Sequence, residues 1–148
     1  MTQVATHSSS EPYIPTKNEP YMSDGQISYF RDKLTGRKTE LKAKIERIIE
    51  NIKTLENVQA DILDRSNSYI GLELEVKSFE RYSNMLDQVE RALERINDGS
   101  FGYCELTGSE IGLRRLEAIP FATMSIAALE KFEAGRKPIY APRQTLYS

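Results

Sequence analysis

The chain has 148 residues, 39% of them hydrophobic and 28% charged, with a formal net charge of −2 at pH 7. This balance excludes a generally basic nucleic-acid-binding protein, and no stretch approaches the roughly 18 apolar residues of a membrane span. The single cysteine excludes an internal disulfide and fits a reducing compartment. Because residues 1–10 also lack the apolar region of a signal peptide, we expect a soluble, cytoplasmic protein.

Residues 1–22 mix serine, threonine and proline without hydrophobic periodicity, which predicts a flexible or loosely draped segment. The only histidine, His7, lies in this segment. A Ser/His/Asp or Cys/His catalytic arrangement is therefore not expected, and the sequence contains no glycine loop of the P-loop or dinucleotide-binding kind.

A long helix is expected to start at Ser23 or Asp24, either of which can cap it. Its apolar residues follow coiled-coil spacing, in a step of seven and then in fours and threes. They are Leu34, Leu41, Ile45, Ile48, Ile52 and Leu55. Gly36 is a weak point that costs about 1 kcal/mol relative to alanine. Basic residues outnumber acidic ones on this helix, and such a face either meets an acidic or phosphate-rich partner or is simply solvated.

A second long helix is expected to end at Asp98. Its apolar residues are Leu72, Phe79, Leu86 and Leu93 at intervals of seven, with Tyr82, Val89 and Ile96 three positions after the last three. Neither helix can bury its apolar stripe alone, so residues 23–98 are predicted to form an antiparallel coiled-coil hairpin. Each arm would be roughly 50 Å long. Gly99 is placed to end the second helix in a left-handed conformation.

The joint of the hairpin, residues 59–68, carries two carboxylates. Asp61 and Asp64 would share one side of a helical turn. The candidate caps of the second helix are Ser66, Asn67 and Ser68. The apolar pair Ile62 and Leu63 has two interpretations: it plugs the open end of the coiled coil, or it belongs to a tip that meets a partner.

Residues 99–116 contain glycines at short intervals between apolar pairs, which predicts two tight turns or a small irregular hairpin. Residues 119–123 are expected to be extended, because the residue before a proline avoids the helical region. A final helix follows, capped by Thr123 or Ser125, and residues 135–148 are expected to form a flexible tail.

Cys104 has the character of a small packed core residue rather than a reactive thiol. A structural zinc site needs about four cysteine, histidine or carboxylate ligands at matched spacing. The polar residues near Cys104 are Glu105, Thr107 and Ser109. They do not make such a site, so no metal and no cofactor are expected here.

The sequence after the second helix is similar to that of a known family. Its globular region closely resembles that of DksA/TraR-type transcription factors. The residues that carry the resemblance are Phe101, Gly102, Tyr103, Cys104, Gly108, the run 110–118 and Pro120. The resemblance extends from Glu19 to Glu133. It implies an all-α-dominated fold with a long antiparallel coiled-coil hairpin, a small zinc-finger-like globular region over residues 99–134, and a C-terminal helix.

The resemblance also implies a regulator of bacterial RNA polymerase rather than an enzyme. Members of the family put the hairpin into the secondary channel of the polymerase and alter open-complex stability at promoters such as rRNA promoters. They act in a stringent-type response, commonly with the alarmone ppGpp. The tip near the active centre would comprise Asp61, Asp64 and Ser66. Lys77 and Arg81 would belong to the polymerase-binding arm of a monomer that has no sequence-specific DNA binding.

The sequence departs from the family pattern at the zinc site. Many members hold zinc with four cysteines, and the matching positions here are Cys104, Thr107, Ser125 and Ala128. This pattern is similar to a zinc-independent branch of the family. Thr107 and Ser125 would then hydrogen-bond to each other or to nearby backbone, and Ala128 would pack against Cys104.

Two further departures concern the tip and the alarmone. Ser66 stands where the family has alanine after the two acids. The positions that match basic residues implicated in alarmone binding are Gln88, Ile119 and Leu129, so ppGpp is retained only as a candidate effector.

Two other functions stay open beside this one. A transcript-cleavage factor would hold a catalytic Mg²⁺ with the tip carboxylates, since Mg²⁺ favours one or two carboxylates plus water. A plain coiled-coil adaptor or oligomer would use its heptads to pair with another chain.

Overall fold

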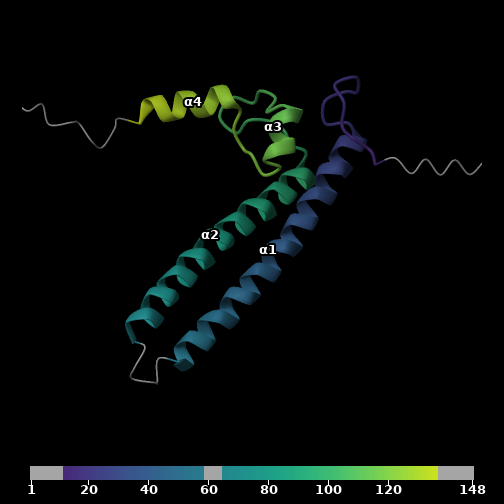
Figure 1. Cartoon of the computed structure of the whole chain (residues 1–148). Helices are drawn as coiled ribbons and strands as arrows, with labels where there is room; N and C mark the ends of the chain where they lie inside the picture. The colour runs from purple at the N-terminus through teal and green to yellow at the C-terminus, as the bar shows by residue number, and fades with distance from the viewer. Residues whose placement is uncertain (1–11, 59–64, 137–148) are drawn as a thin grey trace, which may run out of the picture.

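The computed structural model describes residues 12–58 and 65–136. Within these ranges the chain forms α1 (Asp24–Val58), α2 (Arg65–Asp98), α3 (Leu113–Ala118) and α4 (Ile126–Gly135). α1 and α2 lie side by side in opposite directions as a long hairpin, and α3 and the loops around it gather at one end (Figure 1). The predicted all-α-dominated fold is thereby confirmed. None of the described helices is long and apolar enough to cross a membrane.

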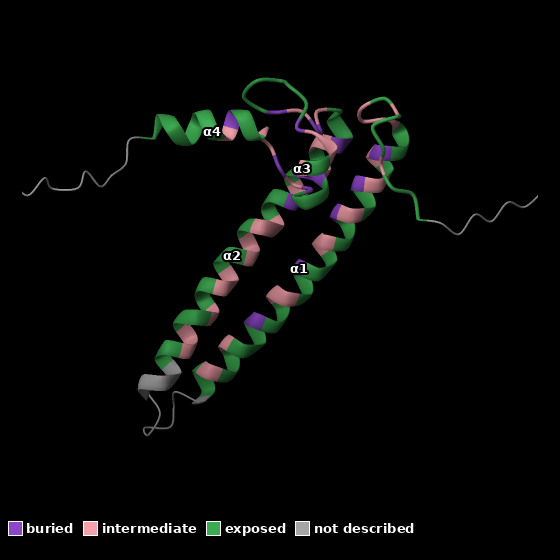
Figure 2. Ribbon diagram, turned by 45° about the horizontal axis from the view of Figure 1, so that its top comes forward, coloured by how far each residue is buried: buried purple, intermediate pink, exposed green. Residues whose placement is uncertain are grey.

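The two arms are held together by their inward-facing apolar residues. We call these two facing rows of apolar residues the seam. Its predicted positions Leu34, Leu41 and Ile48 of α1 are buried, as are Val89 and Ile96 of α2. Figure 2 shows buried and half-buried residues along the facing sides of the two helices and exposed residues along their outer sides. Burial of each large apolar side chain contributes about 1.5–3 kcal/mol, so this seam, rather than the charged surface, holds the hairpin closed.

The seam is tightest where it meets the globular region. Phe30 and Leu34 are 0% exposed, whereas Ile52 and Leu72, near the other end, are only half-buried. The ring centroids of Phe30 and Phe101 lie 5.7 Å apart, so the core of the hairpin continues directly into that of the globular region.

The first part of the globular region is the irregular hairpin that the glycines predict. Gly99 ends α2 with φ +84°. The chain then folds back, so that the N–H of Ile111 donates to the Gly102 carbonyl at 2.9 Å. Tyr103 and Glu110 form an isolated antiparallel bridge, and this pair is the only β pairing in the described part of the chain.

The second part of the globular region differs from the sequence prediction in two places. The helix α3 was not predicted, because its six residues carry too little periodicity to be recognised. Residues 119–123 do not form an extended segment: Ile119 has φ −133° and ψ 88°, and the N–H of Ala122 donates back to the Ile119 carbonyl at 3.1 Å. Pro120 lies inside this turn, since its fixed φ suits a turn as well as a strand.

Caps were predicted for three helices, and two of these predictions are confirmed. The Ser23 hydroxyl accepts from the N–H of Gln26 at 3.4 Å at the start of α1, and the Ser125 hydroxyl accepts from the N–H of Ala128 at 3.2 Å at the start of α4. The prediction for α2 is wrong, because the helix already begins at Arg65. The candidate caps Ser66, Asn67 and Ser68 therefore lie inside it.

The described part of the N-terminal segment, residues 12–22, is draped over the globular region by specific contacts. The Tyr21 hydroxyl donates to the Gly102 carbonyl at 2.7 Å and accepts from the Gly112 N–H at 3.0 Å. The side chain of Gln26 is fully buried beneath the segment and bonds to its backbone at two points. The segment thus closes over the junction between α1 and the globular region.

Removing the Tyr21 hydroxyl should destabilise the fold. Tyr21→Phe keeps the ring but leaves the part-buried N–H of Gly112 without its acceptor, while the Gly102 carbonyl keeps only the N–H of Ile111. The free energy of unfolding measured with urea should therefore fall by about 1–2 kcal/mol. The control Tyr13→Phe removes an exposed bond to Glu19 and should change the free energy by less than about 0.5 kcal/mol. Equal effects of the two variants would show that the Tyr21 bond does not hold the segment in place.

Candidate functional site

The predicted tip is the first candidate site. Residues 59–64, with Asp61, Asp64 and the apolar pair between them, lie outside the described residues, as does the side chain of Ser66. α1 and α2 meet this segment at the end of the hairpin remote from α3 and α4 (Figure 1). The ends of α1 and α2 that flank this segment are therefore separated from the globular region by the full length of the hairpin.

Lys77 and Arg81 lie on the exposed outer side of α2, four residues and one helical turn apart. The Lys77 Nζ is 3.3 Å from the Glu73 Oε1 in an ion pair between two exposed side chains. The Arg81 guanidinium lies 4.9 Å from the ring centroid of Tyr82 and donates to its hydroxyl at 3.3 Å. Exposed contacts of this kind contribute at most about 1 kcal/mol, so both cations can exchange them for contacts with a partner.

The four positions of the predicted degenerate zinc site come together as part of the core. Cys104 and Ala128 are both buried in the same apolar cluster. The Thr107 hydroxyl shares a 2.7 Å hydrogen bond with the Ser109 hydroxyl and accepts from the Ser109 N–H at 3.3 Å. Ser125 caps α4. Of the two arrangements predicted for Thr107 and Ser125, bonding to nearby backbone is the one that the structure has.

Hydroxyl and N–H groups of neighbouring residues affect the pKa of the Cys104 thiol. Contacts from the Thr107 hydroxyl, and then from the N–H groups of Ser125, Thr107 and Leu106, lower the pKa of the Cys104 thiol to about 6. Burial acts in the opposite direction, because desolvation disfavours a thiolate. The donors outweigh it, so the pKa of the thiol lies below its ordinary value of 9.0.

A hollow of about 300 Å³ lies between α2 and the segment that leads into α4. Two of the three positions that the sequence analysis matched to alarmone contacts, Gln88 and Ile119, line it together with Arg91 and Arg115. Arg115 is held in place by a 2.9 Å hydrogen bond from its Nε to a backbone carbonyl before α4. The third position, Leu129, is half-buried on α4 and does not line this hollow. The hollow therefore holds two arginines that the sequence comparison did not single out, beside the carboxylate of Glu105, and Arg91 also forms an ion pair with Asp87 at 3.1 Å.

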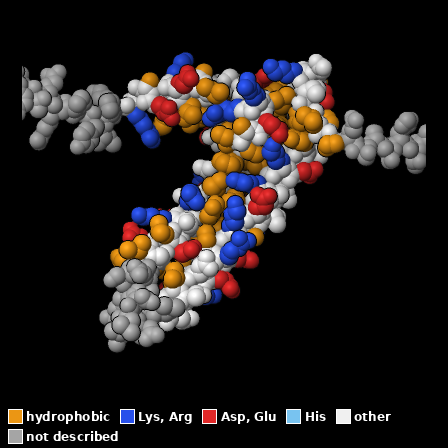
Figure 3. All heavy atoms as spheres, viewed as in Figure 1, with side chains coloured by type: hydrophobic (Ala, Val, Ile, Leu, Met, Phe, Trp, Pro, Cys, Tyr) orange, Lys and Arg blue, Asp and Glu red, His pale blue; other side chains and the backbone are white. Residues whose placement is uncertain are grey.

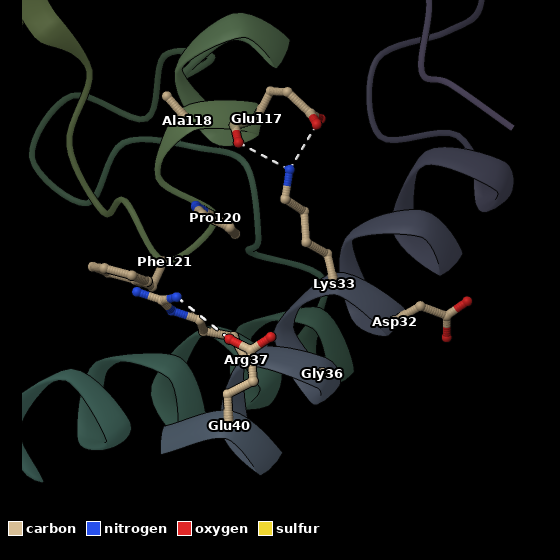
Figure 4. Close-up of a pocket in the computed structure, with 9 residues that line it drawn as sticks. All are labelled: Asp32, Lys33, Gly36, Arg37, Glu40, Glu117, Ala118, Pro120 and Phe121. Atoms are coloured by element: carbon tan, nitrogen blue, oxygen red, sulfur yellow. Dashed lines mark hydrogen bonds and ion pairs between the residues drawn. The ribbon is translucent and has the colours of Figure 1, made fainter. Parts of the chain in front are cut away.

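A second groove, of about 440 Å³, lies between α1 and the segment that joins α3 to α4 (Figure 4). On its wall the Lys33 Nζ donates to the Glu117 Oε1 at 2.6 Å and to the Glu117 backbone carbonyl at 2.9 Å. The Tyr29 hydroxyl donates to the same carboxylate at 2.7 Å. The Lys33 bond lowers the pKa of Glu117, with a smaller contribution from Tyr29. These contacts hold α3 against α1, and sequence periodicity could not reveal them because they span 84 and 88 residues.

Comparison with known proteins matches the chain to one family. Residues 26–96 match the N-terminal domain of DnaK suppressor protein DksA, and residues 99–134 match the prokaryotic dksA/traR C4-type zinc finger. The RNA polymerase-binding transcription factor DksA of Caulobacter vibrioides is 40% identical over 121 residues, which cover 82% of this chain and 85% of the relative. The protein of the same name from Escherichia coli K12 is 33% identical over 116 residues, 78% of this chain and 77% of the relative.

A solved structure shows the same architecture. Transcription factor DksA2 from Pseudomonas aeruginosa matches with a TM-score of 0.74 and 36% sequence identity, over 79% of this chain and 92% of the other. The match thus includes most of both chains.

The matched zinc-finger region does not have the donor set of a C4 site. A structural zinc takes four ligands in a tetrahedron, and the equivalent positions here offer one thiol, two hydroxyls and one methyl group. Among residues 12–58 and 65–136, no three histidine, cysteine, aspartate or glutamate side chains are grouped to hold a metal ion. The described side chains therefore do not fit a zinc ion, and packing and hydrogen bonds hold this region together.

We predict that the protein folds without metal. Protein purified under reducing conditions should contain well under one zinc per chain, and a chelator should leave its thermal midpoint unchanged, because one thiol cannot couple metal binding to folding as four do. Elemental analysis and thermal melts with and without chelator measure this. Near-stoichiometric zinc together with a midpoint lowered by the chelator would contradict the prediction.

The donors around Cys104 should make stability depend on pH. Folding lowers the thiol pKa from 9.0 to about 6, so the stabilisation is complete above pH 9 and is lost as the pH falls through 6. The urea midpoint of the wild-type protein should rise more steeply between pH 6 and pH 9 than that of Cys104→Ala, which shares every other titrating group. Parallel pH profiles would mean that the folded state holds the neutral thiol.

Proposed function

Because the chain belongs to the DksA family, whose members compared above are named RNA polymerase-binding transcription factors, we propose that it regulates transcription by binding directly to RNA polymerase. The observation that carries the proposal is the hairpin, which the N-terminal domain of the family matches from residue 26 to residue 96. The proposed role is not enzymatic, because it requires a group to be placed inside another enzyme rather than a catalytic group of its own.

The shape of the hairpin supports entry into the secondary channel of the polymerase. α1 has 35 residues and α2 has 34, so each arm is roughly 50 Å long while the pair is only about 20 Å wide. The globular region at one end is wider than the hairpin (Figure 1) and would stop it at a fixed depth. Such a probe can carry chemical groups to an internal site that a compact domain cannot reach.

In this proposal Asp61, Asp64 and Ser66 lie near the active centre of the polymerase. A carboxylate in a confined site interacts strongly with nearby metal ions and phosphates, because the local dielectric constant is low and salt screens the charge poorly. A change in this field alters the stability of the open promoter complex. Promoters with short-lived open complexes, such as rRNA promoters in a stringent-type response, are the proposed targets.

The basic residues of α2 and the buried seam support a monomer that binds a protein rather than DNA. Lys77 and Arg81 present positive charge outward, toward an acidic surface of the polymerase. The apolar stripes of α1 and α2 are already buried against each other, so pairing with a second chain is not needed. A net charge of −2 does not favour direct binding to DNA.

The hollow beside α2 supports ppGpp as an effector of the complex. Gln88 and Ile119 carry no charge, but Arg91 and Arg115 line the same hollow. Guanidinium groups bind phosphate through paired hydrogen bonds. In the proposed complex, therefore, these two arginines rather than the positions that match the family would contact the phosphates.

Replacing Asp64 with asparagine should separate regulation from binding. Asp64→Asn keeps the size of the side chain and removes its charge, so the free energy of unfolding should change by less than about 0.5 kcal/mol and binding to core RNA polymerase should be retained. The effect of the protein on open-complex lifetime at an rRNA promoter, measured with and without ppGpp, should fall sharply. The control Glu80→Gln removes an exposed charge of α2 away from the tip and should keep the effect.

Other outcomes point to other functions. An Asp64→Asn variant that unfolds would make the carboxylate a structural cap, and one that regulates normally would remove the tip from the mechanism. Shortening of RNA in backtracked complexes, dependent on Mg²⁺, would replace the proposal with transcript cleavage. If the wild-type protein does not bind core polymerase, the coiled-coil adaptor is the function that remains.

A further inference from the structure

The far end of α2 exposes an unusual amount of apolar surface. Four large apolar side chains within eight residues are open to solvent: Tyr69 at 65%, Ile70 at 57%, Leu74 at 61% and Val76 at 40% exposure. We call these four residues the distal patch. Figure 3 shows hydrophobic side chains gathered on the hairpin beside the segment drawn in grey.

The distal patch is not part of the seam. Between its members, Gly71 and Leu72 face α1: a Cβ on Gly71 would lie 3.7 Å from the side chain of Leu55, and Leu72 is half-buried. Ile70 and Leu74 are one turn apart, so they share a side of the helix, and that side is opposite to the one that carries Leu72. α2 is therefore apolar on its inner and its outer side here, although the hairpin uses only the inner side.

Along α2, the patch continues directly into the basic residues Lys77 and Arg81. Ile70, Leu74, Lys77 and Arg81 follow one another at intervals of four, three and four residues, which places them in a single row along the outer side of α2. The outer row is thus apolar near the tip and basic farther up the hairpin. An outer helix face with this pattern fits a partner surface on which apolar side chains lie next to carboxylates.

The size of the patch decides between a second copy and a larger partner. Ile70 and Leu74 on the outer side of α2, together with Tyr69 and Val76 on the neighbouring side of the helix, expose on the order of a few hundred Å², whereas a stable interface buries about 800 Å² on each partner. The distal patch is too small to hold a dimer together by itself. It has the size of an apolar centre within a longer contact, such as a partner makes when it surrounds the hairpin.

We propose that the distal patch is the apolar centre of the contact between the hairpin and RNA polymerase, with Lys77 and Arg81 at its polar rim. This inference rests on the proposed function and adds which residues carry the affinity. A polymerase that receives the far end of the hairpin must cover Ile70 and Leu74 before it reaches Arg81. Side chains that are buried at the centre of an interface carry most of its affinity, and exposed charges at the rim carry less.

The test compares two leucines that are equally exposed. Leu74 and Leu106 are both 61% exposed, but Leu106 lies in a loop of the globular region. Leu74→Gln should weaken binding of the full-length protein to core RNA polymerase by about 10- to 100-fold, and Leu106→Gln should change it by less than about 2-fold, as is usual for residues outside an interface centre. Competition binding with a labelled wild-type protein measures both, and thermal melts verify that each variant is folded.

A second pair of variants keeps the test decisive. Ile70→Gln should reproduce the loss, and Arg81→Ala should cause a smaller loss that shrinks further at high salt. Wild-type binding with no loss in folded Leu74→Gln and Ile70→Gln would overturn the inference and leave the proposed function standing. A wild-type protein that does not bind polymerase would contradict both the inference and the proposed function. A dimer in sedimentation that Leu74→Gln converts to a monomer would instead assign the patch to a second copy of the chain.

Discussion

The packing of Phe30 in α1 against Phe101 in the globular region is the contact on which the rest of the structure depends. A hairpin of two helices can bury only one stripe of each, so it has no thick core of its own. At the junction Phe30, Leu34, Phe101 and Leu116 are each at most 1% exposed, because helices and loops close around them on several sides. Burial decreases from there along the seam, so one end of the hairpin is held firmly and the other end is held by the seam alone.

The predicted metal-free fold requires this junction to be stable without the ion that the C4-type region of the family implies. Structural zinc contributes roughly 10–16 kcal/mol of apparent binding free energy to small zinc fingers, whereas one hydrogen bond contributes only about 0.5–1.5 kcal/mol. No single contact can replace the ion, so many must share its role. The Tyr21 hydroxyl, the buried Gln26 and the Lys33–Glu117 pair each join the globular region or its covering segment to the start of α1. Cys104 and Ala128, at two of the positions matched to the ligands of a C4 site, pack into the same core.

The sequence predicted what depends on local pattern and missed what depends on distant contacts. Heptads found the hairpin, and Ser23, Gly99 and Ser125 marked helix ends because capping and left-handed turns act over a few residues. Helix α3 was missed since one buried residue, Leu116, orients it. The bonds of Glu117 to Tyr29 and Lys33 cross more than 80 residues, and no periodicity encodes them. The tip acids came from the sequence and the family resemblance, and their surroundings lie outside the described residues.

The gradient of burial along the hairpin explains why the groups proposed to act on the polymerase can gather at its far end. Substitutions there cost the fold little, because Ile52, Leu55 and Leu72 are only half-buried and the junction is remote. The same weakness means that the far end opens more easily than the rest, since local stability follows the number of buried apolar contacts. A partner that covers the outer side of α2 would supply the burial that two helices cannot give each other. The proposed contact with the polymerase would therefore cover the exposed apolar outer row and support the part of the hairpin where the two helices bury each other least.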